Sequence, residues 1–148
     1  MEGAYIYDTV RSPRGRGKNG SLNELTAVAL SAKILQELSE RNNLNTQEIE
    51  DVIWGNVTQV GEQGGCLARS AVIAANYSET TPGLSINRFC ASGLEAVNLA
   101  TNQVKGSAGD AYVAGGVEMM SRVPMGSDGA AIAVDPVSYT HLTLPTKW

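Results

Sequence analysis

The sequence predicts an α/β layered fold with a largely parallel sheet. Segments rich in β-branched residues alternate with segments whose apolar residues recur every three or four positions, in the order βαβαβαβ. Strands separated by helical crossovers pair in parallel. The chain has 148 residues, of which 43% are hydrophobic and 18% charged, so it is long and apolar enough for one domain with a real core.

The first third of the chain predicts a strand, a long helix and a short helix. Ala4–Arg11 contains Ile, Thr and Val residues that favour extended structure. Ser21–Glu24 has the spacing of a capping box, and the apolar periodicity that follows continues to about Arg41. Asn45 or Thr46 is expected to cap the short helix.

The remaining elements follow from the same two periodicities and from the turn residues between them. A strongly helical segment ends before Gly106, which is expected to cap that helix. In chain order, we expect a strand at Val52–Val57, a helix at Cys66–Ala75, a turn and strand within Thr80–Asn87, a helix at Ser92–Lys105 and a strand at Asp110–Gly115.

Composition excludes several classes of function. A net charge of -4 and a pI near 4.9 imply no general attraction to nucleic acid, and an aromatic content of 5% is too low for base-stacking platforms. No apolar run reaches the ~18 residues of a membrane span. Two cysteines do not form a disulfide framework, so we expect free thiols in a reducing, cytoplasmic compartment.

A glycine-rich basic loop follows the first expected strand. Gly15–Gly20 spells G-x-G-x-x-G, but three residues separate it from that strand, and the acid about 20 residues later, Glu40, falls inside a helix. We therefore interpret the segment as a solvated basic loop rather than a dinucleotide site. A weaker alternative is a patch for an anionic cofactor, formed by Arg11, Arg14, Arg16 and Lys18.

Cys90 is the candidate catalytic residue. It lies where an expected strand gives way to a helix, and free N–H groups at a helix N-terminus favour thiolate over thiol. The small residues Ala91, Ser92 and Gly93 leave room for an acyl group. Position alone favours a buried structural cysteine, because free cysteines are commonly buried.

Three ordered motifs resemble those of the thiolases. "NRFCASGLEAV" is similar to the family's nucleophile segment, and "VRSPRGRGKNGSL" is similar to its N-terminal R-[ST]-P-x-G loop. "AGGVEMMSRVP" is similar to its G-G-x-E-x-M-S-x-x-P segment. The residues of these motifs resemble most those of degradative 3-ketoacyl-CoA thiolases. The resemblance implies that residues 1–136 form part of an N-terminal βαβαβαβ half-domain of a thiolase-type layered fold, with the start of a loop region.

The resemblance also implies a reaction. Cys90 would attack the keto carbonyl of a 3-ketoacyl-CoA, release acetyl-CoA and pass the remaining acyl group to a second CoA. The backbone N–H of Cys90 would donate to an oxyanion. No cofactor would be bound permanently, and coenzyme A would be a co-substrate. The intact protein would be a homo-oligomer, with a β-oxidation complex as a further partner.

The family's other catalytic motifs do not occur in this chain. Its histidine in N-x-x-G-G and G-H-P regions is missing, as is its second cysteine in C-x-G-x-G. The single histidine is His141, Cys66 is expected to be a small helix residue, and Glu118 is expected to be structural. We therefore expect the fragment alone to be inactive. Biosynthetic acetoacetyl-CoA thiolase and a non-catalytic, thiolase-like lipid carrier remain as alternatives.

The end of the chain changes character after Pro136. Val137–Trp148 carries three evenly spaced threonines and continues neither periodicity, and Val137–Thr146 resembles one reading frame of a sequencing-library adapter. We interpret residues 137–148 as a non-native tail. The alternative is an edge strand at the end of a domain.

Overall fold

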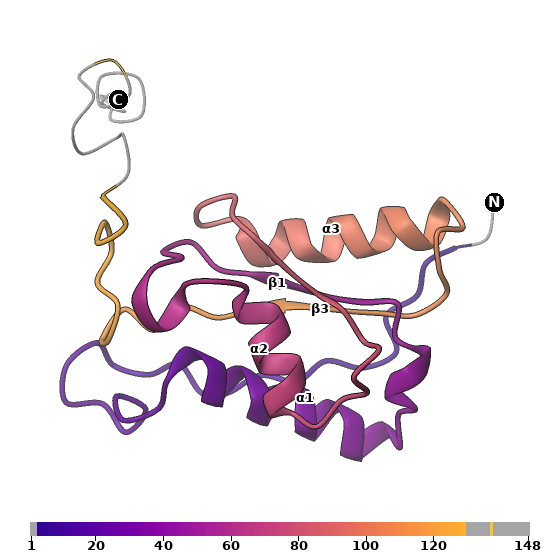
Figure 1. Ribbon diagram of the computed structural model, residues 1–148, viewed down its shortest axis with the longest axis horizontal. Helices are drawn as coiled ribbons and strands as arrows, with labels where there is room; N and C mark the ends of the chain where they lie inside the picture. The colour runs from indigo at the N-terminus through magenta and orange to yellow at the C-terminus, as the bar shows by residue number, and fades with distance from the viewer. Residues whose placement is uncertain (1–2, 130–136, 138–148) are drawn as a thin grey trace.

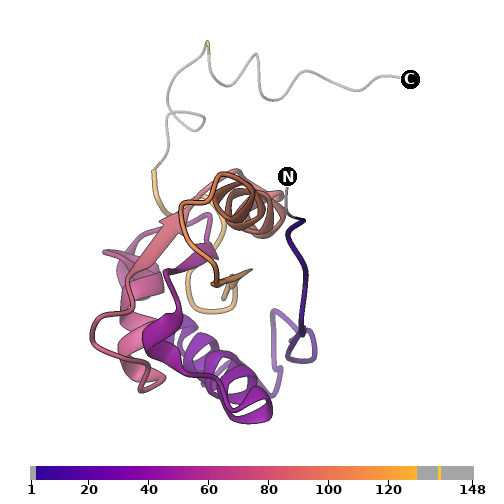
Figure 2. The same ribbon diagram turned by 90° about the vertical axis from the view of Figure 1, so that its right-hand side faces the viewer.

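The computed structural model describes residues 3–129 and Val137, and its elements form three layers. A three-stranded parallel sheet in the order β2-β1-β3 separates α3 on one face from α1 and α2 on the other (Figures 1 and 2). This arrangement confirms the α/β layered fold. The elements are α1 (Ala27–Asn42), η1 (Thr46–Glu48), β1 (Asp51–Gly55), η2 (Gly61–Gln63), α2 (Leu67–Ala74), β2 (Gly83–Ile86), α3 (Ser92–Lys105) and β3 (Tyr112–Gly116).

The central strand β1 is buried because a strand pairs with each of its edges and a helix layer covers each of its faces. Its side chains alternate between the two faces. Val52 and Trp54 belong to the core shared with α1 and α2, whereas Ile53 packs with Ala96 and Ala100 of α3. A strand buried on both faces explains the continuous apolar run in the sequence.

Local signals predicted the bounds of several elements correctly. α3 begins at Ser92 and ends at Lys105, with the Gly106 N–H donating to Asn102 O at 2.8 Å. Asn45 caps η1, since its side chain accepts a hydrogen bond from Gln47 N. The structure therefore confirms these predictions. Among the described residues, no helix is both long and apolar enough to cross a bilayer.

The expected start of α1 is wrong. Residues 21–25 form turns, and the helix begins at Ala27, with Thr26 as its N-cap. The Thr26 side chain accepts a hydrogen bond from Ala29 N at 3.1 Å, which satisfies one of the free N–H groups of the first turn. A capping-box spacing at Ser21–Glu24 was therefore a weaker signal than the single threonine that lies next to the apolar stripe.

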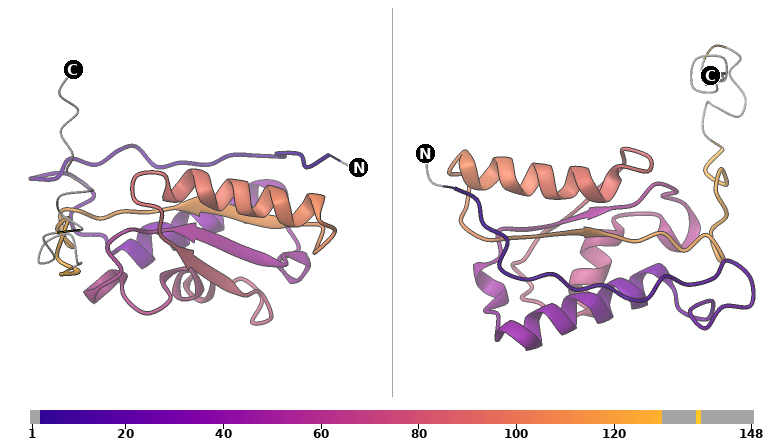
Figure 3. Two further views of the ribbon diagram at one scale, coloured as in Figure 1. Left: turned by 90° about the horizontal axis from the view of Figure 1, so that it is seen from above. Right: turned by 180° about the vertical axis from the view of Figure 1, so that it is seen from behind.

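The expected first strand at Ala4–Arg11 is also wrong, so the described part of the sheet has three strands rather than four. The segment is extended and runs alongside the sheet, but it pairs with no strand of residues 3–129 (Figure 3). A cavity of about 1810 Å³ is lined by this segment, by β3 and by parts of α1 and α3. A strand requires a neighbour at hydrogen-bonding distance, and across this cavity the segment has none.

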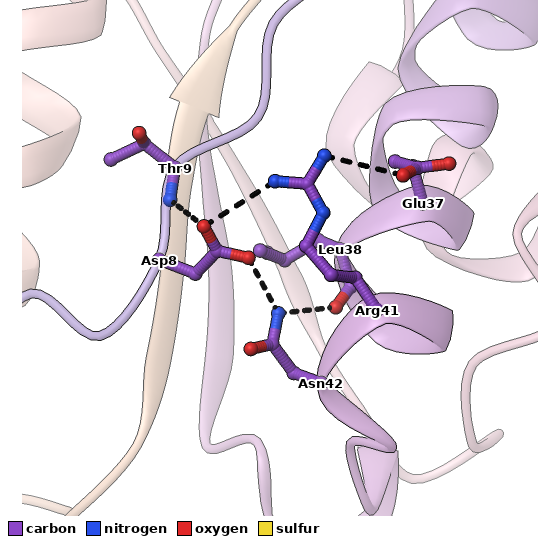
Figure 4. A network of polar contacts seen from close by, with 6 residues as sticks. All are labelled: Asp8, Thr9, Glu37, Leu38, Arg41 and Asn42. Carbon is purple, nitrogen blue, oxygen red and sulfur yellow. Dashed lines mark hydrogen bonds and ion pairs between the residues drawn. The ribbon is translucent and has the colours of Figure 1, made fainter.

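Side-chain contacts with α1 hold the N-terminal segment instead (Figure 4). The Asp8 carboxylate accepts a hydrogen bond from Asn42 Nδ2 at 2.8 Å and pairs with Arg41 at 3.5 Å. Arg41 also pairs with Glu37 one turn earlier in the helix at 3.3 Å. The hydrogen bond from Asn42, with smaller contributions from the Thr9 N–H and Arg41, holds the pKa of Asp8 below its usual value.

Tyr77 connects the end of α2 to α1 and predicts a loss of stability in alkali. Its hydroxyl donates to Leu35 O at 2.9 Å, and burial raises its pKa to about 12. An unfolded tyrosine ionises near pH 10, so above about pH 10 the unfolded chain releases a proton that the native chain retains, and stability falls as pH rises towards about 12. Between about pH 9 and about pH 11, we expect the free energy of unfolding in urea to fall about 1 kcal/mol further in the wild type than in Tyr77→Phe. Equal losses in the two proteins would contradict this prediction.

Candidate active site

The candidate site lies where the carboxyl ends of the three parallel strands meet, which is the edge where ligands bind in open α/β sheets. Three loops come together there. Residues 56–63 follow β1, residues 87–91 follow β2 and lead into α3, and residues 117–121 follow β3. Cys90 belongs to the second of these loops, directly before the N-cap residue Ala91.

Hydrogen bonds from its own neighbours fix the turn that carries Cys90. The Asn87 side chain accepts from Phe89 N at 2.8 Å. Ser92 Oγ accepts from Arg88 N at 2.8 Å and donates to Phe89 O at 2.6 Å. Phe89 adopts a left-handed conformation with φ of 47°, which costs free energy in a non-glycine residue. The side chains of Asn87 and Ser92 therefore hold the loop in a strained shape that its sequence alone did not reveal.

Cys90 is exposed and lies just before the first turn of α3. The residue is a free, exposed cysteine in the described part of the chain rather than a buried one. The N–H groups of Gly93 and Leu94, in the first turn of α3, have no acceptor in the part of the chain that the structure describes. These free donors and the positive end of the helix dipole lie close in sequence to Cys90 and are available to a negatively charged group.

Gly55 allows α3 to begin against the end of β1. A Cβ atom at Gly55 would lie 2.6 Å from Ser92 C and 2.7 Å from Gly93 N, far inside van der Waals contact. No other residue type leaves this space empty. The glycine at the last position of β1 therefore determines how closely the nucleophile loop approaches the sheet.

A second set of contacts joins the loops after β1 and β3. The Glu118 carboxylate accepts from Val57 N at 2.8 Å, from Thr58 N at 3.3 Å, from Gln63 Nε2 at 2.8 Å and from Asn56 Nδ2 at 3.4 Å. Gln63 is fully buried and also accepts from Met119 N at 2.8 Å. Sequence patterns did not identify Gln63, because a buried glutamine has no signature in a glycine-rich loop. The structural role expected for Glu118 agrees with these contacts.

The side chains of the other described residues considered from the sequence bond neither to the backbone of the Cys90 turn nor to the Glu118 carboxylate. Cys66 is free and exposed at the N-cap of α2, and its Sγ donates to Gly83 O at 3.2 Å. Glu95 forms an ion pair with Arg88 at 2.9 Å. The basic loop at Gly15–Gly20 opens no helix, and His141 lies outside the described residues. Within the described ranges, no group of three or more His, Cys, Asp or Glu side chains is placed to hold a metal ion.

Comparisons with known proteins identify the family to which the chain is similar. Residues 4–143 match the family described as "Thiolase, N-terminal domain". The chain is 39% identical over 145 residues to the 3-ketoacyl-CoA thiolase of Colwellia psychrerythraea, which covers 97% of this chain and 37% of that protein. It is 40% identical over 126 residues to the 3-ketoacyl-CoA thiolase of Pseudoalteromonas atlantica, which covers 84% of this chain and 33% of the relative.

A solved structure is similar as well. The acetyl-CoA acetyltransferase of Bacillus anthracis superposes with a TM-score of 0.65 at 36% sequence identity, which covers 69% of this chain and 26% of that one. In total, the chain spans 33% to 37% of the length of the two relatives above. The similarity is therefore confined to one part of those proteins, the part that carries Cys90.

Proposed function

Because the chain belongs to the thiolase family, we propose that Cys90 is the nucleophile of an acyltransferase that cleaves 3-ketoacyl-CoA with CoA. The chain has the α/β layered fold of that family. The single observation that supports this role most directly is the exposed, free thiol of Cys90 directly before α3, whose first-turn N–H groups at Gly93 and Leu94 lack acceptors among the described residues.

The proposed reaction has two halves. The Cys90 thiolate attacks the keto carbonyl carbon of the substrate, the bond between that carbon and the α-carbon breaks, and acetyl-CoA leaves as an enolate that takes up a proton. The thiolate of a second CoA then attacks the acyl-cysteine carbonyl, and the Cys90 thiolate is regenerated. In each half, the residues of this chain hold the thiolate and present backbone N–H groups to developing negative charge.

Residues 1–136 are proposed to be an incomplete part of the N-terminal half-domain, including the start of a loop region. Two observations support this. The chain spans about a third of its relatives, and β3 has an edge that faces the cavity beside the N-terminal segment rather than another strand. The non-native tail at residues 137–148 stays a prediction, since all of it except Val137 lies outside the described residues.

The intact protein is proposed to be a cytoplasmic homo-oligomer that meets acyl-CoA and CoA as substrates, with a β-oxidation complex as a further partner. Two free cysteines support a reducing compartment. Large apolar side chains near the unpaired edge of β2 support association, since Leu84 is 39% exposed and Phe89 is 56% exposed.

A second candidate is biosynthetic acetoacetyl-CoA thiolase activity. The observation that favours it is the structural similarity to an acetyl-CoA acetyltransferase. Assays of the intact protein with acetoacetyl-CoA and with a longer 3-ketoacyl-CoA separate the two, because only the degradative enzyme is expected to cleave the longer substrate efficiently. The non-catalytic carrier is separated from both enzymes by the absence of an acyl-cysteine adduct after incubation with either substrate.

The test of the nucleophile is selective alkylation of the 148-residue chain. Both cysteines lie at a helix start, but Cys66 Sγ donates to Gly83 O at 3.2 Å, whereas Cys90 Sγ has no hydrogen bond to the described residues. With limiting iodoacetamide near neutral pH, we therefore expect Cys90 to react about threefold to tenfold faster than Cys66, the effect of about one net hydrogen bond. Peptide mass mapping measures both rates in one molecule, and the same chain unfolded in urea gives the baseline ratio. Faster labelling of Cys66 in the native chain would contradict the assignment.

A further inference from the structure

Glu118 has a role in the structure that goes beyond holding β3 to its neighbours. Its two carboxylate oxygens receive four hydrogen bonds, and all four donors belong to the loop of residues 56–63 that follows β1. In the part of the chain described, the carboxylate forms no ion pair. An ionised carboxylate is an acceptor only, with lone pairs for about four donors, so it matches this set of donors as no neutral side chain does.

The loop that Glu118 holds is bonded on its other side to the nucleophile segment. Asn56 N donates to Ile86 O at 2.9 Å, which extends the β1–β2 ladder beyond the strands. Asn87 Nδ2 donates to Val57 O at 3.2 Å. Val57 therefore binds both partners: its N–H donates to the Glu118 carboxylate, and its carbonyl oxygen accepts from Asn87.

Asn87 completes the connection to the thiol. While its Nδ2 donates to Val57 O, its Oδ1 accepts from Phe89 N at 2.8 Å, and Phe89 is the strained residue directly before Cys90. Hydrogen bonds of 2.8 to 3.2 Å thus run from Glu118 through Val57 and Asn87 to the backbone next to the nucleophile. If the link at Val57 is lost, the left-handed turn loses one of the contacts that offset its strain.

We propose that Glu118 is a positioning residue for Cys90: its carboxylate fixes the backbone of residues 56–58, and that backbone, through Asn87, holds the turn that presents the thiol at the start of α3. This inference rests on the proposed role of Cys90 as the nucleophile. Glu118 itself acts only through Val57 and Asn87, so its removal changes the geometry and reactivity of the thiol.

Two substitutions break the connection at different points. Glu118→Gln replaces one acceptor oxygen by an NH₂ group that faces two donors, whichever way the amide is turned. Asn87→Asp keeps an oxygen that accepts from Phe89 N but places a second oxygen against Val57 O, so the link to the loop is lost and a negative charge is added. Because Glu118→Gln removes a negative charge instead, an effect that the two variants share reports the broken connection rather than the charge. Glu62→Gln is the matched control, because Glu62 lies in the same region but its carboxylate binds Arg122.

The readout is the rate of Cys90 alkylation divided by the rate of Cys66 alkylation in the full chain, measured for each protein as a function of pH. A urea unfolding curve for each variant checks that the variant is folded under the conditions of the alkylation. We expect Glu118→Gln and Asn87→Asp to lower the ratio about fivefold, the effect of about one net hydrogen bond, and to shift the Cys90 profile to higher pH. We expect Glu62→Gln to match the wild type and Glu118→Asp, which keeps the charge, to recover part of the loss.

The outcomes separate this proposal from the proposed function. A wild-type ratio equal to that of the unfolded chain counts against Cys90 as the nucleophile and therefore overturns both. If the wild-type alkylation ratio is higher than that of the unfolded chain but is the same in Glu118→Gln and Asn87→Asp, Cys90 stays the proposed nucleophile and the positioning role of Glu118 is overturned. Lower stability in Glu118→Gln with an unchanged pH profile would assign Glu118 a structural role only and would also overturn it.

Discussion

The 148-residue chain is expected to show no measurable thiolysis of acetoacetyl-CoA or of a longer 3-ketoacyl-CoA, although it contains Cys90. Claisen cleavage needs a group that protonates the departing enolate and a second set of oxyanion donors. The thiolase histidine and second cysteine motifs are missing from the sequence. Loss of an acid or base costs about 10²–10⁴-fold and loss of an oxyanion donor about 10²–10³-fold, so the combined loss is expected to exceed about 10⁴-fold.

The measurement is release of acetyl-CoA with free CoA present, compared with an intact 3-ketoacyl-CoA thiolase at the same concentration. A Cys90→Ala variant of the 148-residue chain is the control for background chemistry, and it is expected to be indistinguishable from the unmodified chain. Turnover close to that of the intact enzyme would overturn our assignment of the chemistry. It would also direct attention to His141, the single histidine of the sequence.

Gly55→Ala is expected to destabilise the chain by about 3 kcal/mol, the upper part of the range for overpacking a closely packed interior. The added Cβ would lie 2.6 Å from Ser92 C, 2.7 Å from Gly93 N and 2.8 Å from Ser92 O. Because these atoms are backbone, a rotation of a side chain cannot relieve the clash. The first turn of α3 must move away from β1, and Cys90 moves with it.

Gly93→Ala is the matched control on the other side of the same contact. A Cβ atom at Gly93 meets nothing within 4 Å, and alanine is favoured over glycine in a helix by about 1 kcal/mol, so this variant is expected to be slightly more stable than the wild type. Urea unfolding measures both changes, and the Cys90 to Cys66 alkylation ratio is expected to fall only in Gly55→Ala. A Gly55→Ala protein as stable as the wild type would contradict the close approach of α3 to β1.

The sequence by itself determined the features that depend on near neighbours. The bounds of α3, its Gly106 cap and the Asn45 cap of η1 follow from hydrogen bonds within a few residues, and such bonds leave a local pattern. The parallel order of β1, β2 and β3 follows from the helical crossovers between them. Cys90 was placed correctly at a helix start for the same reason.

The tertiary structure alone decided the features that depend on distant partners. Ala4–Arg11 has the composition of a strand but is not one, because a strand exists only as a member of a hydrogen-bonded pair and the segment faces a cavity. Glu118 and Gln63 bond to groups about 55 to 60 residues away in the chain, and Asn87 reaches Val57 across 30 residues. Neither end of such a bond changes the local periodicity, because the contact forms only after β1, β2 and β3 have been brought together by burial of their apolar faces.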